Sequence, residues 1–174
     1  DFNQDPNRRY GLSSPDQMDN THSGVSLTHQ FEWSDNVSST TTLYRNDFKR
    51  NWYKLSGAGN IIDQANAGDA NAQGILDGTV DTSGLNYKNN AREYVSQGVQ
   101  TNFDVNIGNH EFDFGARAHE DEMDRFQPVD VYDQVNGSLV FQNSVAPTGS
   151  NNRFETGEAL SFWALDKWQA TDKL

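Results

Sequence analysis

Hydrophobic and polar side chains alternate with a period of two along five stretches of the chain. This period is typical of β-strands, because successive side chains of a strand point to opposite faces of a sheet. The clearest stretch is 94–107, where valine, phenylalanine and isoleucine alternate with glycine, asparagine and aspartate. We therefore predict an all-β fold, an antiparallel meander of about five long strands. The strands are expected at about residues 22–33, 37–53, 94–107, 111–123 and 158–170.

The alternation also predicts which side chains share a face of the sheet. In the first stretch, Val25, Leu27 and Trp33 form an apolar face. In 37–53, the pattern assigns the aromatic side chains to the apolar face and Arg45 to the polar one, with Leu43 as an apolar exception on the polar side. In 158–170, the large apolar residues do not share one parity, so no phase is predicted there.

The connections between the predicted strands alternate between short and long. Ser34-Asp35-Asn36 and Gly108-Asn109-His110 are expected to be hairpin turns, and Thr171-Asp172-Lys173 a third. The segments 1–21, 55–93 and 124–157 are expected to be long, mainly irregular loops, with a short helix from Asp69 to Asp77. Short turns at one end of a sheet and long loops at the other are the pattern of outer-membrane barrels.

Two other folds fit the same alternation. A soluble β-sandwich has one face packed and one face wet, and its exposed tryptophans would suit a carbohydrate-binding module. A simple porin would share the strands and lack an internal plug. In a membrane barrel the apolar face points outward and is uncovered, whereas in a sandwich a second sheet buries it. Which face is apolar, and whether it is covered, therefore separates these alternatives.

Composition narrows the classes of function. The net charge of −12 and the lack of a lysine or arginine cluster in the sequence argue against nucleic acid as a partner. The chain contains no cysteine, which excludes disulfides and thiolate metal sites. It has no apolar run long enough for a transmembrane helix. We find no motif of a hydrolase, a phosphate-binding loop or a calcium loop, so we expect neither an enzyme nor a cofactor.

The histidines do not have the spacing of a metal site. His22, His29, His110 and His119 are far apart or on different predicted faces, and we expect them to be structural or solvated, with no metal bound. Arg117 and His119 project from the predicted polar face of 111–123 beside two aspartates. They are candidates for contact with an anionic ligand, although ordinary lumen-facing salt bridges are the favoured explanation.

Several short motifs, in this order and spacing, resemble the TonB-dependent outer-membrane receptors, and most closely their ferric-citrate and siderophore branch. The resemblance implies that the chain is a partial barrel domain, residues 1–174, of a transmembrane barrel of 22 strands with long extracellular loops. No plug or TonB-contacting sequence is present, so we expect an excerpt of a longer protein. The motifs are Asn7-Arg8-Arg9-Tyr10, Ser14-Pro15-Asp16-Gln17-Met18-Asp19, Thr41-Thr42-Leu43-Tyr44-Arg45-Asn46-Asp47-Phe48, Asn51-Trp52-Tyr53-Lys54-Leu55, Arg92-Glu93-Tyr94-Val95-Ser96-Gln97-Gly98-Val99-Gln100 and Phe162-Trp163-Ala164-Leu165-Asp166-Lys167-Trp168.

The same resemblance implies a function and a location. A receptor of this kind lies in the Gram-negative outer membrane, binds a ferric chelate and imports it with energy supplied by the TonB complex. Its partners are the chelate, the TonB complex and outer-membrane lipid. By position and chemistry we expect Arg45, Arg117 and His119 to line the ligand path. Further candidates in or beside the long loops are Arg8, Arg9, Arg50, Arg92 and Arg125, since arginine binds carboxylates well.

Overall fold

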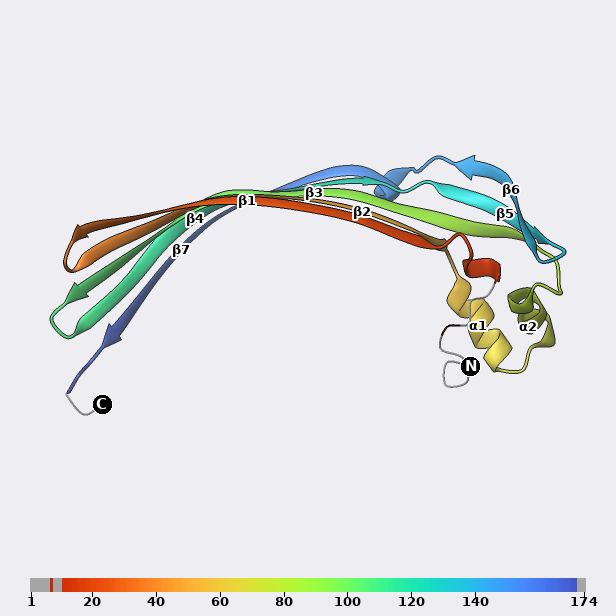
Figure 1. The fold of residues 1–174 in the computed structure, drawn as a ribbon, viewed down its shortest axis with the longest axis horizontal. Coiled ribbons are helices and arrows are strands. Elements are labelled where there is room, and N and C mark those ends of the chain that lie inside the picture. Colours follow the sequence, from red (N-terminus) through yellow and green to blue (C-terminus); the bar gives the residue numbers. More distant parts are fainter. Residues whose placement is uncertain (1–6, 8–10, 172–174) are drawn as a thin grey trace. The chain divides into compact units, whose positions relative to one another are not determined.

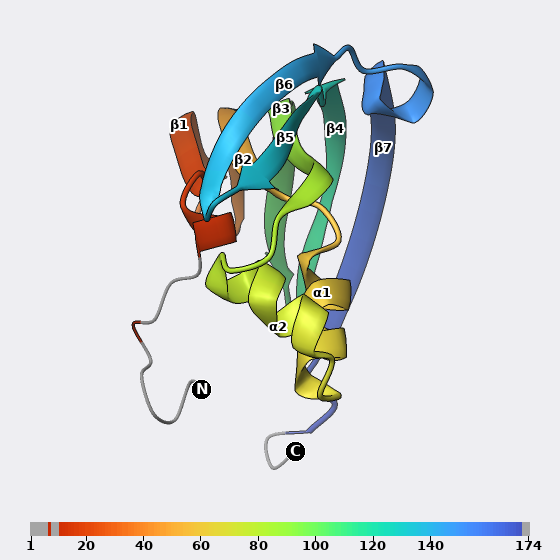
Figure 2. The same cartoon turned by 90° about the vertical axis from the view of Figure 1, so that its right-hand side faces the viewer.

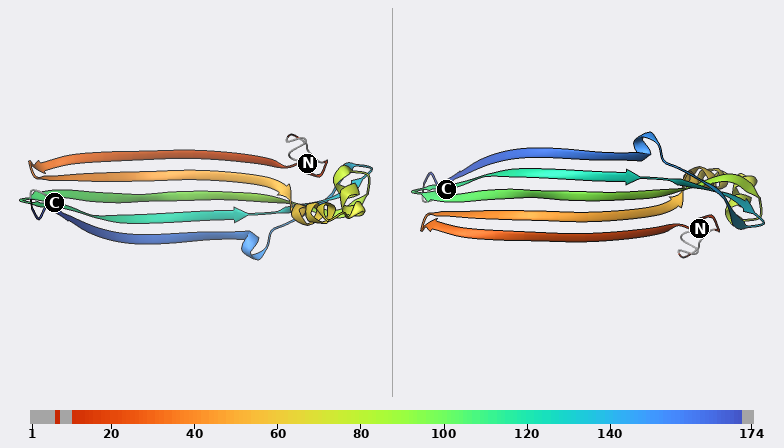
Figure 3. Two further views of the ribbon diagram at one scale, coloured as in Figure 1. Left: turned by 90° about the horizontal axis from the view of Figure 1, so that it is seen from below. Right: turned by 90° about the horizontal axis from the view of Figure 1, so that it is seen from above.

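The computed structural model describes residue 7 and residues 11–171 of the chain. Most of these residues belong to a single sheet, in which β1, β2, β3, β4 and β7 lie side by side in that order (Figures 1 and 3). The elements, in chain order, are η1 (Gly11–Ser13), β1 (Gln17–Ser34), β2 (Val37–Leu55), α1 (Ala58–Asn66), α2 (Ala70–Asp77), β3 (Thr82–Ile107), β4 (His110–Phe126), β5 (Val129–Val135), β6 (Ser138–Val145), η2 (Gly149–Asn151) and β7 (Asn152–Trp168).

The predicted meander is confirmed. The five predicted strands correspond to β1, β2, β3, β4 and β7, and their order in the sheet is their order in the chain. Residues 35–36 and 108–109 form the two predicted short turns. Gly108 has a positive φ of 61°, which glycine adopts without steric cost. Of the predicted third turn, Asp172 and Lys173 lie outside the described residues.

The chain divides into two compact units, which are described separately. The strand unit consists of Thr21–Phe48, Glu93–Asp124 and Phe154–Leu174. The helical unit consists of Asp1–Asn20, Lys49–Arg92 and Arg125–Arg153. No helix among residues 11–171 is both long and apolar enough to cross a membrane.

The strand unit is one layer of sheet with two different faces. Phe103 stacks on Phe114 across β3 and β4 on one face, with ring centroids 5.5 Å apart. This side carries the odd-numbered residues of β1, β2 and β3 and the even-numbered residues of β4 and β7. Most of them are apolar on β1, β3 and β7, whereas β2 contributes Val37 and Leu43, and we call this side the apolar face. Val25 on β1 and Phe162 on β7 are 69% and 73% exposed, and all described strands belong to the same sheet. Within the strand unit, no second layer therefore covers this face.

Cross-strand contacts correct the phase predicted for 37–53. The Thr41 hydroxyl on β2 forms a hydrogen bond with the Thr101 hydroxyl on β3. Thr101 is two residues from Phe103 and projects from the same face, so the odd-numbered residues of β2 lie on the apolar face. Leu43 is thus a regular member of that face. Tyr44 and Phe48 lie on the polar face, where the Phe48 ring stacks on Tyr94 at 6.0 Å. The sequence-based assignment was wrong because it counted every aromatic ring as apolar.

The contacts of β7 also settle its phase. Trp163 donates its indole N–H to Asn102 and Asp113 on the polar face. Trp168 stacks on His110 at the short-turn end of the apolar face, with ring centroids 5.7 Å apart. Phe162 is adjacent to Trp163 and therefore lies on the apolar face. The ambiguity in the sequence arose because one tryptophan belongs to each face.

The predicted long loops are largely ordered, which corrects the expectation that they are irregular. In 55–93, α1 and α2 are followed by the first part of β3. The predicted helix from Asp69 to Asp77 is confirmed as α2, whose N-cap Asp69 accepts hydrogen bonds from the N–H groups of Asn71 and Ala72. In 124–157, β5 and β6 form a hairpin, and β5 also pairs with β3 (Figure 2). The first predicted loop, 1–21, contains η1 and the start of β1.

The helical unit has a small core of its own. Leu55 from the end of β2 and Leu85 and Tyr87 from the start of β3 pack with Leu12 and Leu76. The hydroxyl of fully buried Tyr87 donates to the carbonyl oxygen of Leu12 at 2.5 Å. Burying these side chains against each other removes apolar surface from water, which favours the folded state. This core also contacts partly buried side chains of α1, α2, β5 and β6.

Candidate functional site

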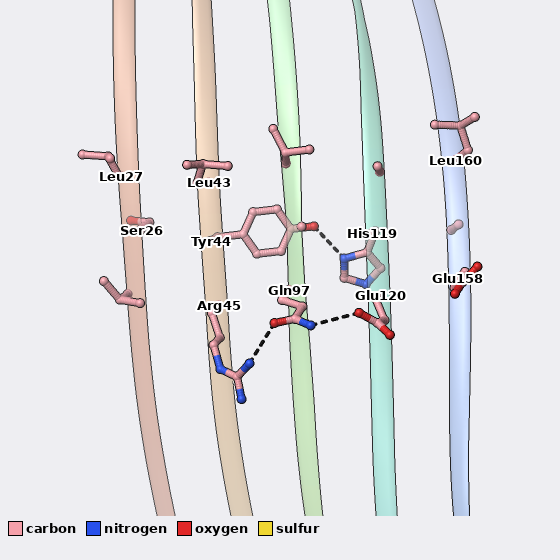
Figure 4. A pocket seen from close by; sticks show the side chains of 15 residues that line it. Ser26, Leu27, Leu43, Tyr44, Arg45, Gln97, His119, Glu120, Glu158 and Leu160 are labelled. Atoms are coloured by element: carbon pink, nitrogen blue, oxygen red, sulfur yellow. Dashed lines mark hydrogen bonds between the residues drawn. The ribbon is translucent and has the colours of Figure 1, made fainter.

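The polar face of the strand unit carries a hydrogen-bonded cluster around Tyr44, of which Figure 4 shows the contact with His119. The Arg117 Nε–H group donates to the Tyr44 hydroxyl oxygen at 2.8 Å. The same hydroxyl lies 2.6 Å from Nδ1 of His119, and Nε2 of His119 lies 2.9 Å from a carboxylate oxygen of Asp121. With the tautomer that donates from Nε2 to Asp121, the Tyr44 hydroxyl donates to Nδ1. The four side chains then form one directional chain of hydrogen bonds.

Gly98 makes room for this cluster. A Cβ atom at residue 98 would lie 2.6 Å from the Tyr44 hydroxyl oxygen and 2.5 Å from the carbonyl oxygen of Ala118. Glycine therefore lets the Tyr44 ring lie across β3 toward β4. The His119 side chain is 13% exposed, whereas that of Asp121 is 61% exposed. The cluster is thus built into the sheet surface and open on its aspartate side.

Arg117 is oriented by this arrangement. Its Nε is used by Tyr44, and its guanidinium carbon lies 5.5 Å from the Tyr44 ring centroid. Among the described residues, no hydrogen bond engages its two terminal nitrogens. A guanidinium that keeps both terminal NH₂ groups for a ligand and is held beside an aromatic ring suits a carboxylate or phosphate group.

A second cluster lies further along the same face. The Asn102 side-chain amide donates to Asp113 at 3.0 Å, and the Trp163 indole N–H is shared between Asn102 at 2.9 Å and Asp113 at 3.1 Å. The Trp163 ring covers Gly115, where a Cβ atom would collide with it. Both clusters therefore place an aromatic ring over a glycine of a neighbouring strand.

Arg45 does not lie with Arg117 and His119, which corrects its predicted place. Its guanidinium bonds to Asp47 at 2.9 and 3.0 Å and to Gln97 at 2.8 Å, and Gln97 donates to Glu120 (Figure 4). These side chains have the parity of Leu43 and Phe103 and form a polar end to the apolar face. The reason is the reversed phase of β2. Arg117 and His119 are brought together as predicted, and Arg45 is separated from them by the thickness of the sheet.

The candidate loop arginines lie on strands of the helical unit. Arg50 belongs to β2, Arg92 to β3 and Arg125 to β4, and each is partly buried. Arg8 and Arg9 lie outside the described residues. The sequence placed Arg92 and Arg125 beside loops because it predicted β3 to begin too late and β4 to end too early.

The other three histidines have local roles. The His22 ring meets Phe48 edge-on, and His29 stacks on Phe31. His110 begins β4 and lies 2.9 Å from a carboxylate oxygen of Asp166. Among the residues that the structure describes, no group of three or more histidine and carboxylate side chains could hold a metal ion.

Tyr44, Gly98 and Trp163 are the site residues that the sequence did not indicate. Each acts across strands, and a single sequence shows neither the register nor the partner. A hollow of about 890 Å³ extends over all five strands at the level of Gly98, and most of its lining residues, among them Leu43, Arg45 and Leu160, have the parity of the apolar face (Figure 4). Comparison of the chain with protein-family models, curated proteins and solved structures finds no match.

Proposed function

We propose that the chain forms part of the wall of a TonB-dependent outer-membrane receptor that imports a ferric chelate. The observation that carries the proposal is the contrast between the two faces of the strand unit. One face is apolar, aromatic and exposed, and the other carries connected polar clusters. A sheet placed between lipid and a water-filled interior requires this contrast, because outward and inward side chains alternate along each strand of a barrel.

The dimensions of the apolar face suit a bilayer. Its apolar side chains extend over nine residues of β1, from Val25 to Trp33, and over nine residues of β3, from Val99 to Ile107. A tilted membrane-spanning strand needs about 9–11 residues. Trp33 and Trp168 lie near the short-turn end of this face, where the Trp33 indole N–H donates to Ser39. Such rings suit the aromatic girdle at a membrane interface.

The polar face would then line the ligand path. Arg117 is its best-prepared anion contact, since Tyr44 and His119 fix its orientation. The ferric chelate and the coupling to TonB come from the family resemblance of the sequence motifs. The structural contribution to the proposal is a cationic, hydrogen-bonded contact that suits a chelate bearing carboxylates.

Single-cysteine labelling tests which face of the strand unit contacts lipid. The chain contains no cysteine, so only the introduced residue can react with a maleimide. Phe103→Cys probes the apolar face, and the adjacent Asn102→Cys is its matched control on the polar face. In outer membranes of cells that express the chain, we expect Phe103→Cys to react with a lipid-soluble maleimide only. Asn102→Cys should react with a water-soluble maleimide. Labelling of both positions from water would contradict the proposal. Fractionation of the chain with soluble proteins would also contradict it, and together with a Phe103→Cys that reacts with neither reagent would favour the β-sandwich.

Charge reversal tests the ligand path separately. Arg117→Glu should weaken binding of an anionic ferric chelate by about tenfold or more, because a charged hydrogen bond is replaced by repulsion. Val99→Ala on the apolar face is the control and should leave the affinity nearly unchanged. Equal losses in both variants, or no loss in Arg117→Glu, would remove Arg117 from the ligand path.

A further inference from the structure

Two aromatic rings on the polar face of the strand unit lie over glycines of a neighbouring strand. The Tyr44 ring crosses β3 above Gly98, where a Cβ atom would lie 2.6 Å from the phenol oxygen (Figure 4). The Trp163 ring lies over Gly115, where a Cβ atom would lie 2.4 Å from a ring carbon. Glycine thus lets each ring approach the backbone, and the other side of the ring is directed away from the sheet. Both aromatic residues are partly exposed.

Hydrogen bonds hold both rings in place. The Trp163 indole N–H is shared between Asn102 and Asp113. The Tyr44 hydroxyl oxygen accepts from Arg117 at 2.8 Å. A ring that is already fixed loses little conformational freedom when a ligand binds. The π face of an aromatic ring is negative and attracts the C–H groups of a sugar ring, so the two rings are prepared platforms for sugar units.

The register of β3 and β4 sets the distance between the two platforms. Phe103 stacks on Phe114, and counting along the antiparallel strands from this pair places Gly98 opposite His119. Gly115 and His119 are four residues apart on β4, which corresponds to about 13 Å along the strand. A monosaccharide therefore reaches one ring, whereas an oligosaccharide that lies along the strands reaches both.

Arg117 lies between the two rings. It is two residues from Gly115 and two from His119 on β4, and its Nε–H group is engaged by Tyr44. Its terminal nitrogens have no hydrogen-bond partner among the residues that the structure describes. A guanidinium binds a carboxylate with two parallel hydrogen bonds. The arrangement therefore favours a sugar unit that carries a carboxylate.

Neutral hydrogen-bonding groups stand on both sides of Arg117. The register of β3 and β4 places Gln100 opposite it. On β7, Gln169 donates to the backbone oxygen of Asn109, and counting from this pair places Ser161 opposite Arg117. Gln100 and Ser161 are exposed. An amide and a hydroxyl each donate and accept hydrogen bonds, which is what sugar hydroxyl groups require of a binding site.

The polar face is hollowed beside the Tyr44 ring. A hollow of about 690 Å³ lies over β3, β4 and β7, and most of its lining residues, among them Ser96, Asp121 and Gly157, have the parity of the polar face. No atom lies within 4 Å of a Cβ position at Gly157. Ligand sites commonly have volumes of about 300–1,000 Å³. An oligosaccharide that lies over both rings therefore has room to continue into this hollow.

We propose that Trp163, Arg117 and Tyr44 form a binding site for an acidic oligosaccharide. Two sugar rings stack on Trp163 and Tyr44, and the carboxylate of a uronic acid unit between them binds Arg117. The proposal goes beyond import of a ferric chelate. It rests on one part of the proposed function, the opening of the polar face to water.

Isothermal titration of the full chain in detergent micelles tests the site. The probes are trigalacturonate, which has three acidic sugar units, galacturonate, which has one, and maltotriose, which is neutral. We expect trigalacturonate to bind most tightly, because it alone reaches both rings and Arg117 together. Absence of saturable trigalacturonate binding, or binding of galacturonate or maltotriose that is as tight, would overturn the proposal.

Matched tryptophan variants localise the binding. Trp163→Ala should weaken trigalacturonate binding by about tenfold, because a few aromatic contacts carry most of the binding energy. Trp168→Ala removes the same kind of side chain from the apolar face, and its affinity should stay within about twofold of that of the unmodified chain. Equal losses in the two variants would overturn the site.

An arginine variant tests the acidic character of the ligand and serves where Trp163→Ala does not fold. Arg117→Gln should weaken trigalacturonate binding by about tenfold and remove the preference for trigalacturonate over maltotriose. A preference that persists in Arg117→Gln would overturn the assignment of an acidic ligand to this site.

The labelling of Asn102→Cys separates this proposal from the proposed function. Reaction with the water-soluble maleimide, without trigalacturonate binding, would remove the oligosaccharide site and leave the receptor wall standing. Labelling of Asn102→Cys from lipid alone would overturn both. Trigalacturonate binding by a chain that binds no ferric chelate would support the oligosaccharide site and remove the chelate.

Discussion

The long strands contribute residues to both the helical unit and the strand unit, but the two units differ in whether their apolar side chains are buried. In the helical unit, two helices and a hairpin add side chains that bury Leu85 and Tyr87 in a core. In the strand unit, residues such as Leu160 and Phe162 project from a single layer and are more than 60% exposed. An apolar face of this extent on a monomer marks a site for lipid or protein contact. Stability in the helical unit is therefore internal, whereas in the strand unit it depends on what covers the apolar face.

The same substitution in the two units gives the largest expected contrast. Leu85→Ala removes a side chain that is 6% exposed and should cost about 2–5 kcal/mol of the unfolding free energy, as buried leucines do. Leu160→Ala removes one that is 67% exposed and should cost less than about 0.5 kcal/mol in detergent solution. Urea unfolding followed by circular dichroism measures both. Similar costs would mean that the apolar face is packed, which contradicts the contrast between the units.

A charge introduced on either face of the strand unit tests whether the two faces meet different environments. Phe103→Arg places a cation where we propose lipid, and it should cost about 2–4 kcal/mol in a bilayer, the range for the middle of a barrel wall. Asn102→Arg, one residue away, projects from the polar face and should cost much less. Unfolding in lipid vesicles gives both values. Equal tolerance of arginine at the two positions would show that the two faces meet the same environment.

Sequence periodicity was enough to predict the five strands, their order and two of their turns, because each alternating stretch is long. It failed for the phase of β2, where Tyr44 and Phe48 are aromatic and yet belong to the polar face. Their positions depend on Gly98 and Tyr94 of the next strand. A single sequence does not show that partnership.

The hairpin of β5 and β6 had a local signal that was overlooked. Asn136 and Gly137 both have positive φ, 48° and 75°, as the two central residues of a type I′ turn require. An Asn-Gly pair between alternating apolar residues is a strong hairpin signal.

Replacing a glycine that lies beneath an aromatic ring should lower the stability of the strand unit by a smaller amount. Gly98→Ala would place a Cβ atom 2.6 Å from the Tyr44 hydroxyl oxygen, so the ring must move. We expect a loss of about 1–3 kcal/mol, the usual cost of overpacking, and weaker positioning of Arg117. Gly157→Ala is the control, because no atom lies within 4 Å of its Cβ position. Thermal unfolding compares the two, and equal stability of both variants would show that the ring does not depend on Gly98.

Alkaline pH should give the smallest change in the free energy of unfolding, and the change should come from the helical unit. Burial raises the pKa of Tyr53 and of Tyr87 well above the ordinary value of 10, and for Tyr53 hydrogen bonds to Tyr132 and Asp130 add to the rise. Both phenols therefore keep their protons in the folded state at a pH where the unfolded chain loses them. Their contribution to stability is complete below pH 10 and decreases as the pH rises from 10 toward the folded-state pKa values.

The decrease cannot exceed about 1.4 kcal/mol per pH unit for each phenol, and partial exposure of Tyr53 makes its share smaller. Urea unfolding at about pH 9 and at about pH 11, followed by the helical circular dichroism signal, measures it because both described α-helices belong to the helical unit. Tyr87→Phe removes one ionisable group. It should lower stability at about pH 9, where the hydrogen bond to the Leu12 carbonyl is lost, and make the decrease toward about pH 11 shallower. An unchanged slope in Tyr87→Phe would mean that Tyr87 ionises alike in the folded and unfolded chain, and that the core of the helical unit is open to water.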